Sequence, residues 1–264
     1  MKQVLKSLYG RVFGLADDDS VVAARGLRVG PFPKQFLQPS PLHVVMFDDF
    51  DGAAILGTWG VNKGSDGGAA NFAINAALNG TIRATTGAGA GASMAVNGVQ
   101  VSGHLNFEAD STGLEFGCRV KMAAITTAAI FVGFTNQVAA LQMPINGAGG
   151  GDTFTNNAAD AVGFLFDTTM TTQKWWGVGS KASVSAAGQN SGFAPVAGTY
   201  DDMYIQVDAN GNASFFLNGS PVGTIQNNSL TKSVPLSPVI AAFRRSAAST
   251  TIDVDYIYAA CGRV

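Results

Sequence analysis

The stretch from residue 202 to residue 225, DMYIQVDANGNASFFLNGSPVGTI, predicts three consecutive β-strands joined by tight turns. In residues 202–208 polar and apolar side chains alternate, which is the two-residue period of a strand with one buried face. Asn218-Gly219 separates two β-prone runs, and both residues tolerate the positive φ of a type I′ hairpin turn. The stretch therefore predicts an antiparallel meander within a larger sheet.

The composition extends this prediction to the whole chain. It has 264 residues with 33 Gly and only 13% charged residues, which fits many short strands and tight turns better than a helical enzyme. Strand candidates lie at 71–77, 80–85, 91–96, 105–109, 113–122, 129–135, 161–167, 174–179, 203–208, 213–218, 221–225, 237–245 and 250–259. About a dozen such strands predict an all-β fold, a two-sheet antiparallel jelly-roll sandwich.

An N-terminal arm precedes the predicted sandwich. Residues 2–15 space their apolar side chains as a short amphipathic helix would, whereas 25–41 are rich in Gly and Pro. Proline lacks the donor that a sheet needs, so this second segment is expected to run extended. We place the boundary near Leu42, which divides the chain into an arm, 1–41, and a sandwich, 42–264.

The arm is basic and the sandwich acidic. Residues 1–41 contain six basic residues and three aspartates, a balance of +3 that leaves −5 on the remainder of a chain of net charge −2. The basic residues are Lys2, Lys6, Arg11, Arg25, Arg28 and Lys34. Such asymmetry predicts a segment that binds an acidic partner surface, with a merely solvated arm as the alternative.

Several classes of protein are disfavoured by the sequence. The overall negative charge argues against a nucleic-acid partner, and the lack of an apolar run of about 18 residues argues against a membrane span. The N-terminus does not match a signal peptide, so synthesis in the cytoplasm with reduced thiols is expected. Cys118 and Cys261 form no disulfide framework, and whether they pair stays open.

Three motifs together resemble the concanavalin A-like (laminin-G-like) jelly rolls. They are Phe47-Asp48-Asp49-Phe50-Asp51-Gly52 with Trp59, the hairpin around Asn218-Gly219, and the closing Ile252-Asp253-Val254-Asp255-Tyr256-Ile257-Tyr258. The resemblance covers roughly residues 44–260 and implies that the first and last strands of the sandwich pair in one sheet. The family includes lectins, sugar-binding modules, β-glucanases and structural domains, so fold does not choose the function.

No catalytic set was found in the sequence. The resemblance implies that a β-glucanase would carry Glu-x-Asp-x-x-Glu on one strand, but the only glutamates are Glu108 and Glu115, seven positions apart. On one continuous strand an odd offset places two side chains on opposite faces. His43 and His104 accompany no nucleophile motif. The sequence therefore predicts a protein that is not an enzyme and uses no cofactor.

Two places in the sequence offer candidate metal ligands. Asp48, Asp49 and Asp51 follow the first strand and are expected near Asp253 or Asp255 of the last one, and clustered oxygens of this kind hold Ca²⁺. The Asp208-x-Asn210-x-Asn212 run also offers alternating oxygens but is simpler as a turn. We predict no metal site and favour solvated turn and edge residues at both places.

Aromatic side chains give the candidate contact site. In a strand neighbouring residues face opposite ways, so of Trp175 and Trp176 one should lie in the core and one should point outward. An outward Trp suits stacking on a sugar ring, a protein contact or edge packing.

Two functional hypotheses follow. The Ala-, Gly-, Asn- and Thr-rich sandwich with a basic arm resembles in style the structural proteins of tailed bacteriophages. It implies a non-enzymatic capsid decoration or minor head protein of the virion, with the major capsid protein or another virion protein as partner. The alternative is a carbohydrate-binding module of a fibre or adhesion protein, with a host glycan as ligand. A homo-oligomer is a guess from capsid symmetry.

Overall fold

The computed structural model describes residues 43–264 except 53, 67–69, 76–79, 90–92, 111–112, 228, 247 and 263–264. The chain divides into two compact units, Met1–Pro41 and Leu42–Val264, and all described residues belong to the second. The predicted arm, its helix and its six basic residues therefore lie outside the described residues.

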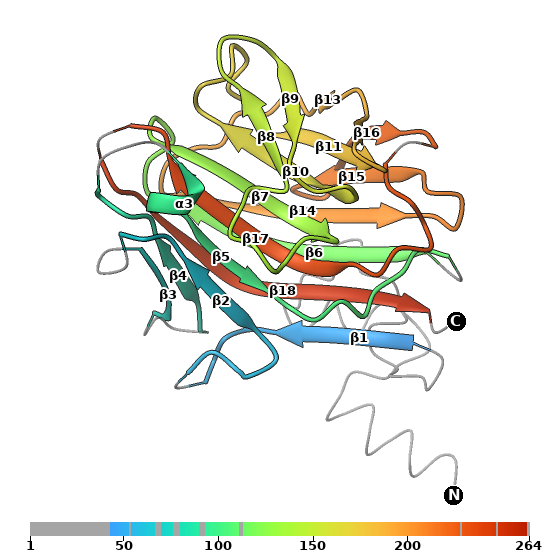
Figure 1. Ribbon diagram of the computed structural model, residues 1–264, viewed down its shortest axis with the longest axis horizontal. Coiled ribbons are helices and arrows are strands. Elements are labelled where there is room, and N and C mark those ends of the chain that lie inside the picture. Colours follow the sequence, from blue (N-terminus) through green and yellow to red (C-terminus); the bar gives the residue numbers. More distant parts are fainter. Residues whose placement is uncertain are drawn as a thin grey trace, which may run out of the picture. The chain divides into compact units, whose positions relative to one another are not determined.

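Two eight-stranded antiparallel sheets form the second unit (Figure 1). Sheet A has the order β16 (Ser220–Ile225), β15 (Ala213–Leu217), β14 (Tyr200–Val207), β6 (Leu114–Met122), β18 (Thr251–Gly262), β4 (Ile82–Thr85) and β3 (Asn71–Ile74), and β1 (His43–Asp48) pairs with β18. Sheet B has the order β12 (Val184–Ser185), β11 (Trp176–Lys181), β10 (Ala161–Asp167), β7 (Ala128–Thr135), β17 (Ser237–Arg244), β5 (Val99–Ser102) and β2 (Gly60–Lys63), and β13 (Gln189–Asn190) pairs with β11. The predicted all-β jelly-roll sandwich is confirmed.

The meander that suggested the fold is present as β14, β15 and β16. Asn218 and Gly219 have φ of 51° and 79°, so both residues of the tight turn lie in the left-handed region that the Asn-Gly pair predicts. The Asn218 side chain adds two bonds, because its Oδ1 accepts from the Asp202 amide at 2.9 Å and its Nδ2 donates to Asp201 at 3.0 Å. The turn is thus fixed by backbone conformation and by its side chain.

The two ends of the sandwich meet in sheet A. β1 pairs antiparallel with β18, from His43 opposite Gly262 to Asp48 opposite Ile257. This confirms the pairing of first and last strands that the resemblance implied. At the end of β1, the carboxylate of Asp48 accepts from the Phe50 amide and from the Trp59 indole, both at 2.8 Å. The entry motif therefore anchors the loop that follows β1.

The main core lies between the sheets and is rich in phenylalanine. Phe164 of β10 meets Phe215 of β15 edge to face at 5.4 Å between ring centroids. Phe116 of β6 meets Phe134 of β7 in the same way at 5.6 Å. Edge-to-face packing of this kind adds about 1 kcal/mol per pair to the burial of the rings. These contacts join strands of opposite sheets and fix the spacing of the sandwich.

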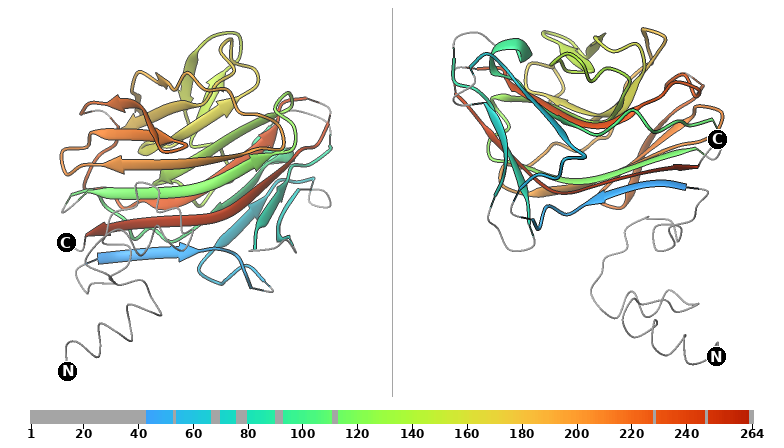
Figure 2. Two further views of the ribbon diagram at one scale, coloured as in Figure 1. Left: turned by 180° about the vertical axis from the view of Figure 1, so that it is seen from behind. Right: turned by 60° about the horizontal axis from the view of Figure 1, so that its bottom comes forward.

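The central strands of sheet B are buried on both faces. A two-stranded sheet of β8 (Ile145–Ala148) and β9 (Thr153–Asn156), with the short helix α3 (Met94–Asn97), lies on its side away from sheet A (Figure 2). Every residue of β7, β10 and β17 is buried, whereas β6 of sheet A alternates. Burial on two faces removes the reason for alternation, which is why β7 has the nearly continuous apolar sequence AAIFVGFT.

Two strand predictions were wrong. The helix α3, residues 94–97, overlaps the predicted strand 91–96, which fits the helix-favouring Met and Ala there. The segment 105–109 forms one isolated bridge, Phe107 with Leu236, in place of a strand. Both segments contain apolar residues that are buried by tertiary packing, and short apolar runs do not distinguish a strand from other buried backbone.

Candidate functional site

The outer face of sheet A is polar. Phe116, Cys118, Val120 and Met122 of β6 belong to the main core, so the intervening side chains of this strand point away from it. The outward residues of β6 include Glu115, Arg119 and Lys121. The same alternation places charged or aromatic residues outward on the neighbouring strands. This face therefore brings together side chains from separate parts of the chain.

One row of Cα partners crosses four strands of sheet A. Arg83 of β4 lies opposite Asp253 of β18, Asp253 opposite Lys121 of β6, and Lys121 opposite Tyr200 of β14. The guanidinium of Arg83 donates to both oxygens of Asp253, at 2.6 and 2.9 Å, and Lys121 Nζ lies 3.1 Å from Oδ2. Burial by itself raises the pKa of Asp253, but the bonds from Arg83 and Lys121 outweigh it and hold that pKa below its ordinary value.

A second group of charges lies beside this row, where β18 has a bulge. The register between β18 and β6 shifts between Val254 and Ile257, and a bulge of this kind re-aims side chains. Arg119 Nη1 donates to Asp255 Oδ2 at 2.9 Å, and Arg119 Nε lies 3.4 Å from Asp202 Oδ1. We call the whole set the charged strip: Arg83, Arg119, Lys121, Tyr200, Asp202, Asp253 and Asp255.

Tyr200 connects the two groups of charges. The guanidinium carbon of Arg119 lies 4.5 Å from the centroid of its ring, and Lys121 Nζ lies 4.7 Å from it. Contacts of cations with an aromatic face at this distance are attractive. The strip is also open to solvent, since the side chains of Arg83, Arg119 and Asp202 are 42%, 41% and 46% exposed. The cations are therefore held in place while their outer atoms stay accessible.

A tyrosine and glutamate cluster lies on the same face, further along β6. Tyr258 Oη donates to Glu115 Oε2 at 3.0 Å. Tyr204 stands opposite Gly117 and next to the Phe216 ring, 5.7 Å between centroids. Burial, and secondarily the charge of Glu115, raises the pKa of both tyrosine hydroxyls above the ordinary value. The two tyrosines are buried, so this cluster offers Glu115 rather than a flat aromatic surface.

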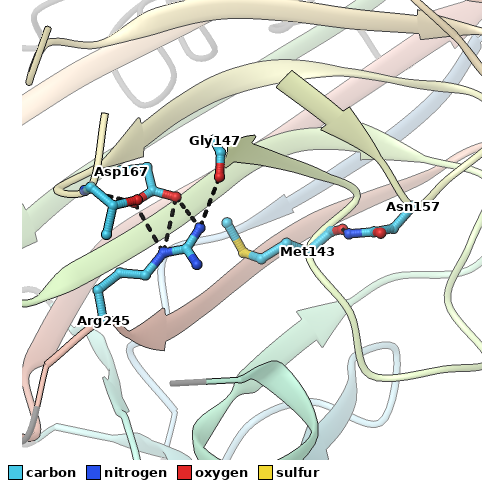
Figure 3. A network of polar contacts seen from close by, with 6 residues as sticks. Met143, Gly147, Asn157, Asp167 and Arg245 are labelled. Carbon is cyan, nitrogen blue, oxygen red and sulfur yellow. Dashed lines mark hydrogen bonds and ion pairs between the residues drawn. The ribbon is translucent and has the colours of Figure 1, made fainter. Parts of the chain in front are cut away.

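The outer face of sheet B has a different character. Its apolar side chains pack under β8 and β9, and one buried ion pair fixes this cover (Figure 3). Arg245 Nε donates to the two carboxylate oxygens of Asp167 at 3.0 and 3.1 Å, and Nη2 donates to the Gly147 carbonyl of β8 at 3.1 Å and also contacts Asp167. The Asp167 side chain is fully buried. The arrangement joins β10, β8 and the end of β17 and serves packing.

The two predicted contact tryptophans lie on opposite faces of sheet B, as alternation requires. Trp175 is in the main core, its ring against Phe166, and its indole donates to Asp201 at 2.9 Å. Trp176 faces outward but is only 8% exposed, because Phe154 of β9 packs against it at 5.5 Å. The expectation of an exposed Trp is corrected, since the cover over sheet B was not foreseen. Neither ring is open for stacking on a sugar.

Four of the six aspartates considered as metal ligands bind other groups, and the other two, Asp49 and Asp51, are exposed. Asp253 and Asp255 bind cationic side chains, and Asp48 holds Trp59. Among the described residues no group of three or more His, Cys, Asp or Glu is arranged to hold a metal ion. Asp208 accepts from the amides of Asn210 and Asn212 at 2.8 and 2.9 Å, as in a turn. These bonds to the backbone lower the pKa of Asp208.

The remaining titratable candidates do not form a catalytic set with one another. Glu108 lies in the loop before β6, whereas Glu115 is within β6, so the two glutamates do not share a strand. His104 is exposed in the loop after β5. The register places Cys118 opposite Ile257 and Cys261 opposite Leu114, about 13 Å apart along the strands, so these buried thiols are free.

No family model and no curated protein matches the sequence. Solved structures do match the fold. A β-glucanase of Bacillus licheniformis has a TM-score of 0.53 at 12% identity, covering 81% of this chain and 96% of the other. A structure from work on endo-acting O-glycanases of human gut microbiota has a TM-score of 0.55 at 10% sequence identity, and the match covers 81% of this chain and 97% of the other. An endo-β-1,4-glucuronan lyase of Trichoderma reesei has a TM-score of 0.50 at 9% sequence identity, and the match covers 83% of this chain and 95% of the other. The likeness is one of fold.

These neighbours overturn the prediction that the chain is not an enzyme. This chain shares its fold with hydrolases and a lyase that act on carbohydrates. The prediction rested on the absence of two motifs, paired glutamates on one strand and a nucleophile motif to accompany a histidine. A missing motif excludes only the chemistry that uses it. In the described part of the chain no helix is long and apolar enough to cross a membrane.

Proposed function

We propose that the protein is a carbohydrate-active jelly-roll protein that binds a polysaccharide on the outer face of sheet A, at the charged strip. The observation that carries this proposal is the strip itself: seven polar or aromatic side chains from four strands, cross-linked by ion pairs on an accessible face. The carbohydrate-active neighbours of the same fold support the class of ligand.

The chemistry of the strip suits sugar hydroxyls. A hydroxyl both donates and accepts, so it is bound best where carboxylates and guanidinium groups alternate. Asp202 and Arg119 provide such a pair at 46% and 41% exposure. Strand pairing places the two residues opposite each other and the Tyr200 ring packs against Arg119, so Arg119 has little side-chain freedom to lose on binding.

The test is affinity electrophoresis of the full chain through gels that contain polysaccharides, followed by calorimetry with the best ligand. Tyr200→Ala is expected to weaken binding about tenfold, because it removes the ring that positions Arg119 and Lys121. Lys232→Ala is the matched control, since Lys232 forms an exposed pair with Asp110 outside the strip. Equal loss of binding in both variants would contradict the proposed site.

Cleavage of the bound polysaccharide is a second candidate function. Glu115 accepts a hydrogen bond from Tyr258 on the same face as the strip, and a positioned carboxylate is a candidate acid or base. We expect Glu115→Gln to abolish release of reducing ends or unsaturated products, while Glu108→Gln, the only other glutamate, leaves it unchanged. Turnover that survives Glu115→Gln would rule out this role for Glu115.

The virion hypothesis makes a separate prediction. The neighbours named above favour the carbohydrate-binding alternative, and a capsid decoration role stays a prediction. It is tested by co-sedimentation of the full chain with undecorated capsids over a salt series. Salt-sensitive co-sedimentation would support attachment through the basic residues of 1–41, and its lack at every salt concentration would count against the hypothesis.

A further inference from the structure

We infer that the charged strip selects polysaccharides that carry carboxylate groups, such as polyuronates, over neutral glycans. The inference rests on the proposed function and names its class of ligand. It is carried by the row across four strands, in which the cations are exposed to solvent and the carboxylate that holds them, Asp253, is buried.

The row through Asp253 shows the layering most clearly. The side chain of Asp253 is 5% exposed, whereas those of Arg83 and Lys121 are 42% and 29% exposed. Both cations bind the same carboxylate, so the row carries two positive charges for one negative charge. The bonds to Asp253 use only Nε and Nη2 of Arg83, and a guanidinium has further donors. The accessible side of this row is therefore cationic.

Arg119 adds a third cation, beside the carboxylates of Asp202 and Asp255, so that the strip as a whole has three cations and three anions and its excess of accessible cations lies in the row. Arg119 makes one hydrogen bond, to Asp255, and a longer ion pair of 3.4 Å with Asp202. It also stacks on Tyr200, beside Lys121. Arg119 and Lys121 lie two residues apart on β6, about 7 Å, and Arg83 lies on β4, two strand spacings or about 10 Å from Lys121 and about 12 Å from Arg119. A short stretch of an extended polysaccharide can contact all three.

Guanidinium groups favour carboxylate as the anion. Arginine presents planar pairs of donors that match the two oxygens of a carboxylate, and Arg83 already binds Asp253 in this way. A uronate presents the same planar group. The net charge of residues 42–264 is −5, so general attraction of polyanions is not expected from this unit. Binding of an anionic polysaccharide must then come from a local group of cations.

The experiment compares polygalacturonate with its fully methyl-esterified form, using calorimetry on the full chain. The two polymers differ in the carboxylate charge, so the pair isolates the interaction at issue. We expect the acid form to bind at least about tenfold more tightly at low salt, with the difference shrinking as salt is raised. Arg83→Gln should reduce binding of the acid form about five- to tenfold and leave the ester unaffected.

Asp202→Asn is a variant that is expected to raise the affinity for the acid form, whereas Arg83→Gln lowers it. Asp202 is 46% exposed, so its substitution should leave the fold intact. Removing this anion from the strip should strengthen binding of the acid form about two- to fivefold. Lys232→Gln, at the exposed pair outside the strip, should change neither affinity. Weaker binding by Asp202→Asn would overturn the inference.

The outcomes separate the two proposals. Equal affinity for acid and ester would overturn the selectivity and leave polysaccharide binding intact. Tighter binding of a sulfated glucan than of the polyuronate would overturn the assignment to carboxylate. Binding of no polysaccharide, acidic or neutral, by the wild-type chain would overturn the proposed function itself.

Discussion

The outer faces of the two sheets use opposite physical means to hold side chains in place. On sheet B, apolar residues lie under β8 and β9, and the one ion pair we describe there, Asp167 with Arg245, is buried. On sheet A, the strip is held by ion pairs whose cations stay accessible, since Arg83 and Arg119 are 42% and 41% exposed. Burial makes the first face important for stability. Accessibility makes the second face available for binding.

The largest expected effect on stability comes from the buried pair. Arg245→Met should lower the free energy of unfolding by about 3 to 5 kcal/mol, because it leaves the fully buried carboxylate of Asp167 without its cation. Arg83→Met, on the accessible face, should cost less than about 1 kcal/mol. Both are measured by urea unfolding of the full chain. Similar losses in the two variants would break the comparison between the faces.

The cover over sheet B can be tested with an aromatic side chain. Phe154→Ala should cost about 2 kcal/mol, less than a fully buried Phe, because the half-buried ring packs against Trp176. Phe193→Ala is the control, since that ring is 52% exposed and its loss should stay within about 0.5 kcal/mol. If the control costs as much as Phe154→Ala, then β9 does not hold the cover in the way we describe.

The smallest expected effect is a pH dependence on the accessible face. The pKa of Asp253 lies below its ordinary value in the folded chain, so its charged form stabilises the fold above about pH 4, the pKa in the unfolded chain. This contribution is lost as the pH falls through the lowered pKa. Asp253→Asn should therefore be less stable than wild type at neutral pH, and the difference should shrink in acid. A constant difference from pH 7 to pH 2 would show that the charge is not responsible.

Part of the site was within reach of the sequence. The alternating residues of 113–122 and 250–259 predict strands with charged outward faces, and Arg119, Lys121, Asp253 and Asp255 belong to those strands. The alternation of residues along each strand does not predict that these charged side chains lie close together. Arg83 and Asp253 are 170 residues apart, and only the order of strands in sheet A makes them neighbours.

The prediction of an exposed tryptophan is wrong for a related reason. The prediction that Trp175 and Trp176 face opposite ways follows from strand geometry, and the structure agrees. Whether an outward residue meets solvent depends on what covers the sheet. The cover includes the short strands β8 and β9, and Phe154 of β9 packs against Trp176. No local pattern in the sequence predicts that contact.

By itself the sequence determined the class of fold and the turns, because these follow from periodicity and from Asn-Gly backbone preferences. The pairing of the first and last strands was implied by the resemblance to the concanavalin A-like jelly rolls. Tertiary structure decided which outer face is covered, which charges become partners and where a bulge redirects Asp255. The physical reason is that strand direction and alternation are local properties. Sheet order and the packing of one layer on another depend on contacts between residues far apart in the chain.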